Sequence, residues 1–64
     1  MRSLVNVRLA EARKTKRLVS GELGIDPATL WRWSTDRYVG TMCLRDAERL
    51  ARCLGCRVAD LFEE

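Results

Sequence analysis

The segment KRLVSGELGIDPATLWRWST, residues 16–35, constrains the fold more than any other stretch of the chain. Its apolar positions have the spacing that two short helices crossing at a steep angle require. They are Val19, Leu23, Ile25, Leu30 and Trp33. Ser20 is small where the two backbones would approach, and Gly24 suits a turn that needs a positive φ. The segment predicts a helix-turn-helix motif, which offers its second helix to the major groove of DNA.

The residues that precede the two helices of this motif are good helix starters. Thr15 can cap a helix over about 16–23. Asp26 is a strong N-cap for a second helix over about 27–34. Pro27 fits the first position of that helix because its missing N–H would have no partner there.

A first helix is expected over about 3–13. Its apolar stripe consists of Val5, Leu9 and Ala12. In an alternative register this helix extends to about residue 16, and the next helix shrinks to 20–23. We prefer the first register because it uses all five apolar positions of the motif.

The C-terminal part of the chain predicts two more helices. After a loop over 35–43 around Gly40, a helix is expected over about 44–54, and Gly55 suits the position after its end. The apolar face of this helix would consist of Leu44, Ala47, Leu50, Ala51 and Leu54. A last short helix is expected over about 58–63. Its inward side chains would be Val58, Leu61 and Phe62.

Composition supports a helical fold for this chain of 64 residues. The chain is 47% hydrophobic and 33% charged, a balance typical of a folded globule and unlike that of a disordered tail. One Pro and four Gly give few structural breaks, and no segment shows the sustained alternation of a strand. We therefore expect one compact all-α domain over residues 1–64, with five helices.

Positive charge is concentrated near the start of the chain. The net charge is +3, but residues 1–18 alone carry six basic side chains against one acidic one, a net of +5. The six are Arg2, Arg8, Arg13, Lys14, Lys16 and Arg17. A basic segment that leads into a helix-turn-helix favours a polyanionic partner. The alternative is an ordinary solvated helix face.

Neither a signal peptide nor a membrane span is predicted. The apolar stretch 4–9 is interrupted by Asn6 and Arg8, and no run approaches the ~20 apolar residues that a span needs. We therefore expect a soluble, cytoplasmic protein. Three cysteines, an odd number, do not make a disulfide framework.

The C-terminal sequence LRDAERLARCLGCRVADLFEE, residues 44–64, adds a second pattern. Its Leu-rich helix, Leu-Gly pair and final Asp-Leu-Phe resemble the closing pattern of the lambda-repressor/Cro-like helix-turn-helix family, also called the XRE family. The branch with Cys after that Gly, here Cys56, is the most similar. With residues 16–35, the resemblance covers about two thirds of the chain. It implies a five-helix domain, sequence-specific binding of double-stranded DNA without a cofactor, and dimers on palindromic sites.

Three positions depart from the pattern of that family. The first motif residue is commonly Gln and is Lys16 here. The first residue of the second motif helix is often a polar base reader and is Pro27 here. The following loop commonly carries Glu-Asn-Gly, where this chain has Ser34, Thr35 and Asp36. These changes affect the expected base readout more than the fold.

The outer side of the second motif helix offers four candidate DNA contacts, Ala28, Thr29, Trp31 and Arg32. Arg32 could bind a guanine edge or grip a phosphate, Thr29 could hydrogen-bond either, and Ala28 could touch a thymine methyl. Trp31 could stack on a sugar, enter the groove or anchor a protein partner. The alternatives are a plain exposed charge at Arg32 and packing of Trp31 under the 35–43 loop.

Four more candidates flank this helix along the chain, Lys16, Arg17, Arg37 and Tyr38. Lys16 and Arg17 begin a helix whose dipole also favours phosphate. Arg37 and Tyr38 follow the second motif helix and would approach the other side of the groove. Such residues supply affinity rather than specificity, and simple solvation is the alternative.

Metal, redox and catalytic chemistry have little support in the sequence. Cys53 and Cys56 have C-x-x-C spacing, but a zinc site needs four ligands and the chain has no His. Cys43 could be a third ligand only if a carboxylate were the fourth. We expect buried core thiols and no metal site. Without a His, a nucleophile motif or a phosphate-binding Gly loop, no enzymatic activity is expected.

The leading hypothesis is a DNA-binding transcriptional regulator of the phage-type or mobile-element repressor kind. One alternative is a protein-interaction module on the same fold, antitoxin-like or anti-repressor-like, and another is a metal or redox sensor through Cys53 and Cys56. No small-molecule substrate is expected. A homodimer is expected on DNA, with Leu61 and Phe62 near the chain end as its seam.

Overall fold

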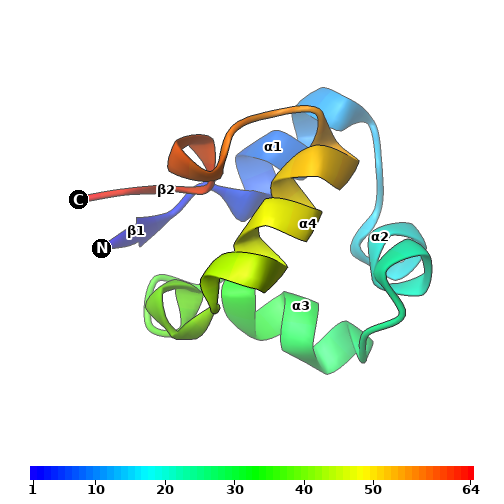
Figure 1. Cartoon of the computed structure of the whole chain (residues 1–64), viewed down its shortest axis with the longest axis horizontal. Helices are drawn as coiled ribbons and strands as arrows, with labels where there is room; N and C mark the ends of the chain where they lie inside the picture. The colour runs from blue at the N-terminus through cyan, green and yellow to red at the C-terminus, as the bar shows by residue number, and fades with distance from the viewer.

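Four α-helices, two 3₁₀ turns and one pair of short strands make up the computed structural model, which describes residues 1–64. In chain order the elements are β1 (Arg2–Ser3), α1 (Val5–Ala12), α2 (Lys16–Leu23), α3 (Pro27–Trp33), η1 (Val39–Thr41), α4 (Leu44–Leu54), η2 (Val58–Leu61) and β2 (Phe62–Glu63). Figure 1 shows α4 in the middle of the molecule, with α1, α2 and α3 arranged around it and the two chain ends side by side. None of the helices combines the length and the apolar character needed to cross a membrane.

The core is one apolar cluster to which all four α-helices and η2 contribute. Its ten buried members are Val5, Leu9, Val19, Leu30, Trp33, Ala47, Leu50, Ala51, Leu54 and Leu61. Leu23 and Ile25 of the motif are partly buried against this cluster, and Ser20 is buried at 2% exposure. The apolar positions of the motif therefore meet as the sequence predicts, and burial of their surface is the main stabilising term.

The start of α2 settles the register of the first two helices. The helix α1 ends at Ala12, and Arg13 follows in the left-handed conformation with φ 56°. The Thr15 side chain accepts a hydrogen bond from the Leu18 N–H at 3.1 Å, so α2 begins directly after this cap. The predicted helix over 16–23 is confirmed, and the alternative register with a longer first helix is wrong.

The turn between α2 and α3 has the geometry that its residues predict. Gly24 adopts φ 67°, in the left-handed region that favours glycine. The Asp26 carboxylate accepts the Ala28 N–H at 2.8 Å, and Pro27 occupies the first turn of the helix. The helix then ends at Trp33, within one residue of the expected end. Both predicted caps of the motif are therefore confirmed.

The prediction of a fifth α-helix is wrong. Residues 58–63 form the 3₁₀ turn η2 and then the strand β2. The Asp60 carboxylate accepts the Arg57 N–H at 3.0 Å and so caps the tight turn. The residues after the turn are extended because they pair with the start of the chain. The inward direction of this segment is nevertheless as predicted, since Val58 and Phe62 pack against the core.

The first helix is shorter than expected because the start of the chain forms a strand. The helix α1 begins at Val5, and Ser3 pairs antiparallel with Phe62. The Ser3 hydroxyl donates a hydrogen bond to the Trp33 carbonyl at 2.8 Å. Ser3 therefore ties the first strand to the end of α3.

Two leucines bear on the predicted apolar faces and on the predicted dimer seam. Leu44 is 67% exposed and does not join the apolar face of α4. It stands at the first position of that helix, where side chains lean back beyond the helix end. Leu61 is fully buried in the core, as predicted for an inward side chain, and it therefore has no exposed surface to offer to the predicted dimer seam. The rest of the α4 face is buried as predicted, and Gly55 follows with φ 69°.

Candidate nucleic-acid interface

The helix α3 buries one side and exposes the other. Leu30 and Trp33 are 0% and 6% exposed in the core. Ala28, Trp31 and Arg32 are exposed, and their spacing of three and four positions puts them on one helix face. Because Trp31 is 62% exposed, the alternative in which it packs under the following loop is wrong.

The exposed side of α3 lies at the rim of the molecule. In Figure 1 the helix runs along the lower edge, with α4 on its inner side. The helix α2 lies beside its N-terminal end, and the loop that contains η1 follows its C-terminal end. Thr29 is half buried, at the border between the inner and outer sides of the helix. This arrangement leaves the outer side of α3 accessible to a large ligand.

Four cations on α2, α3 and the following loop have no acidic partner. They are Lys16, Arg17, Arg32 and Arg37. Arg17, Arg32 and Arg37 are exposed, and Lys16 is half buried at the first position of α2. Unpaired guanidinium and ammonium groups remain free to bind an external anion.

The acidic residues of the same segment are all engaged elsewhere. Glu22 accepts a hydrogen bond from a thiol of α4 at 3.0 Å. Asp26 caps α3, and Asp36 accepts the Ser3 N–H at 2.8 Å. None of these carboxylates pairs with Lys16, Arg17, Arg32 or Arg37, so the four cations are not neutralised by a contact within the protein.

Arg37 and Tyr38 form a stacked pair in the loop after α3. The guanidinium carbon of Arg37 lies 5.3 Å from the centre of the Tyr38 ring. This distance is within the range of a cation–π interaction. The stack restrains an exposed arginine and leaves its N–H groups free for an anion.

The basic N-terminal segment is less available to a ligand than its net charge predicts. Arg2 pairs with Glu63 at 3.2 Å. Arg8 contacts Glu11 at 2.6 Å and donates to the Asp60 carbonyl at 2.8 Å. These contacts, together with those of a lysine described next, stabilise the fold. Half of the six basic residues in this segment therefore already have polar partners within the protein.

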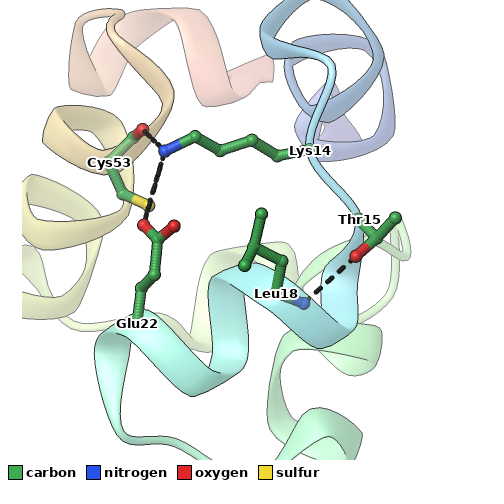
Figure 2. Close-up of polar contacts among 5 residues, drawn as sticks. All are labelled: Lys14, Thr15, Leu18, Glu22 and Cys53. Atoms are coloured by element: carbon green, nitrogen blue, oxygen red, sulfur yellow. Dashed lines mark hydrogen bonds and ion pairs between the residues drawn. The ribbon is translucent and has the colours of Figure 1, made fainter.

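Lys14 joins three parts of the chain, an arrangement that local sequence patterns did not reveal. Figure 2 shows its side chain reaching from the link between α1 and α2 to the end of α4. The ammonium donates to the Cys53 carbonyl at 3.0 Å and lies 3.4 Å from the Glu22 carboxylate. The Cys53 thiol donates to the same carboxylate at 3.0 Å. We call Lys14, Glu22 and Cys53 the α2–α4 joint, because they fix α2 against α4.

The α2–α4 joint shifts the ionisation of two of its members. The thiol of Cys53 and the ammonium of Lys14 both donate to Glu22 and lower the pKa of its carboxyl below the ordinary value. Burial, and then the hydrogen bond to Glu22, raises the pKa of the Cys53 thiol. Near neutral pH Glu22 is therefore a carboxylate and Cys53 a neutral thiol.

The three cysteines do not form one site. Cys43 is exposed and its sulfur lies 3.2 Å from the Asp46 carboxylate, so the expectation of a buried thiol is wrong there because Cys43 precedes α4 at its exposed end. Cys53 and Cys56 are half buried against the core. They line different surface pockets. Cys53 lines one together with Glu22, and Cys56 lines the other together with residues of α1. No cluster of three or more potential metal ligands occurs.

The comparison with known protein families agrees with this geometry. The family model described as a Cro/C1-type HTH DNA-binding domain matches residues 5–63 of the chain. Comparisons with curated proteins and with solved structures gave no match. The matched range contains all four α-helices and η2.

Proposed function

The chain belongs to the family of Cro/C1-type HTH DNA-binding domains, and on that basis we propose a transcriptional regulator that reads the major groove with α3. We propose in addition that it is a repressor of the phage or mobile-element type and that it acts without a cofactor. The observation that supports this most directly is the exposed outer side of α3, which carries the unpaired Arg32 and is flanked along the chain by three more unpaired cations. That combination fits a groove lined by phosphates.

The candidate contacts divide into two roles. Arg32 is the only long hydrogen-bond donor on the outer side of α3, and its role is to bind a guanine edge. Ala28, Thr29 and Trp31 complete the surface that enters the groove. The surrounding residues position the protein on the phosphates. These are Lys16, Arg17, Arg37 and Tyr38.

Two copies on a palindromic site complete the proposal. A single chain of this size reaches few base pairs, and a two-fold pair with recognition helices roughly 34 Å apart doubles the site. The buried Leu61 does not contribute to the contact between the copies. The cytoplasm is the compartment that this role requires.

Selection of bound sequences from random duplex DNA tests the proposal. We expect a preferred palindrome with a guanine in each half-site, and sedimentation is expected to detect two protein copies on one duplex. Affinity for that duplex should fall with rising salt, with a log–log slope of about −0.9 for each phosphate neutralised. Absence of binding at low salt, or binding that ignores salt, contradicts the proposal.

A further inference from the structure

Most of the outer side of α3 is apolar. Pro27, Ala28 and Trp31 are all exposed. Pro27 and Ala28 lie four and three positions before Trp31, so the three side chains form one continuous surface. We call these three residues the apolar face of α3. Arg32 borders this face, because it follows Ala28 by four positions.

The first turn of α3 has no free backbone donor for a base edge. Pro27 lacks an N–H. The Ala28 N–H donates to the Asp26 carboxylate at 2.8 Å, and the Thr29 N–H donates to the Asp26 carbonyl at 2.9 Å. A base that meets the apolar face is therefore recognised through an apolar group.

The charges around the apolar face favour nucleic acid over a protein partner. The unpaired Lys16 and Arg17 lie on α2, which packs against α3, and Arg37 lies in the loop after it. An apolar protein surface would leave these cations without partners, whereas the phosphates on both sides of a groove supply them. Among the groups that base pairs expose in the major groove, the 5-methyl of thymine is the apolar one.

We propose that the apolar face of α3 packs against thymine 5-methyl groups beside a guanine bound by Arg32. This inference rests on the proposed function and specifies what the site reads. The preferred half-site contains thymine at one or two positions next to that guanine. There the protein recognises the methyl group and not a hydrogen-bonding edge.

Replacement of thymine by deoxyuridine tests this directly, because it removes the methyl and keeps the hydrogen-bonding groups. Each thymine of the selected duplex is replaced in turn, and the Kd is measured. We expect a loss of roughly fourfold at each contacted position, the size expected for one buried methyl. Thymines outside the contact should tolerate the replacement.

Two variants assign the effect to the apolar face. Trp31→Ala and Ala28→Gly should bind the thymine duplex more weakly, and the penalty for deoxyuridine should shrink or vanish in at least one of them. Val7→Ala is the matched control, because Val7 is 45% exposed on α1, which is not part of the proposed interface. This control should keep both the affinity and the full penalty. Circular dichroism checks that each variant keeps its helix content.

The outcomes separate this inference from the proposed function. Strong binding to a selected duplex with no deoxyuridine penalty at any position overturns the inference alone. A penalty that persists undiminished in both Trp31→Ala and Ala28→Gly also overturns it, because the methyl is then read by another residue. Failure to bind any duplex overturns the proposed function and this inference together.

Discussion

The outer side of α3 and the α2–α4 joint use similar residues in opposite ways. At the joint, Lys14 lies 3.4 Å from the Glu22 carboxylate and both contact Cys53, so the charges are satisfied inside the protein. On α3, Arg32 is exposed and has no acidic partner. Pairing within the chain fixes the position of a helix, and its absence leaves a charge for a ligand. Tertiary contacts, and not the number of basic residues, decide which cations can bind DNA.

The largest difference between the two regions should come from Arg32→Ala. Loss of a guanine contact should weaken binding to the preferred duplex by about 1–3 kcal/mol and relax the preference at one base pair. Thermal stability should be unchanged, because the side chain is exposed and unpaired. Titrations of the preferred and a random duplex measure the effect. An equal loss of affinity for both duplexes would show that Arg32 contacts only a phosphate and not a base.

Lys14→Met should show the reverse behaviour. It removes the hydrogen bond to the Cys53 carbonyl and leaves a chain of similar length. We expect the free energy of unfolding to fall by about 1 kcal/mol, as for one charged hydrogen bond that is partly screened by solvent. Urea denaturation measures this. Binding to DNA by the folded variant should be unchanged, and a loss of affinity similar to that of Arg32→Ala would break the distinction between the two regions.

Lys16→Ala and Arg17→Ala should each weaken binding to all duplexes alike. A phosphate contact carries no sequence information, so the preferred and random sites should lose affinity by the same factor. Each substitution should also reduce the steepness of the log–log salt dependence by about 0.9. Arg2→Ala is a suitable control, because Arg2 pairs with Glu63 at the chain ends. An unchanged slope of the salt dependence would show that the substituted residue makes no phosphate contact.

The smallest expected effect is the pH dependence of the joint. The lowered pKa of Glu22 means that the folded protein holds this proton less tightly than the unfolded chain. Its contribution to stability is therefore present above the ordinary value of 4.5 and is lost as pH falls through the lowered value. The raised pKa of Cys53 has the opposite sign, so its contribution is lost as pH rises above 9.0.

Melting temperatures across the pH range check both signs. Glu22→Gln should flatten the acid side of the profile, and Cys53→Ala should flatten the alkaline side. Arg32→Ala should follow the unmodified protein at every pH, since it lies outside the joint. Identical acid limbs for Glu22→Gln and the unmodified protein would show that this carboxylate contributes nothing there.

The parts of the fold that the sequence predicted depend on short-range interactions. Thr15 and Asp26 cap helices whose N–H groups lie two or three residues away, and Gly24 supplies a φ that few other residues adopt. The spacing of Leu30 and Trp33 also determines which side of α3 faces outward. The exposure of Trp31 and Arg32 could therefore be predicted, whereas their roles on DNA remain predictions.

The parts that were missed depend on contacts between distant residues. Ser3 pairs with Phe62, and neither short strand has an alternating pattern of its own. Lys14 meets Cys53 across 39 positions of the chain, and no local pattern distinguishes it from the free Lys16. The sequence therefore predicted a basic segment correctly. It could not show which basic side chains are paired within the protein and which remain free to bind a ligand.

The pairing of the chain ends also sets the mechanical response of the protein. Because β1 and β2 run antiparallel with Arg2 opposite Glu63, a force that separates the two ends loads the outer pair first and unzips the strands. The load next reaches the bond from the Ser3 hydroxyl to the carbonyl of Trp33, the last residue of α3. Tension on the termini thus acts on the C-terminal end of α3, the helix that we propose for the major groove.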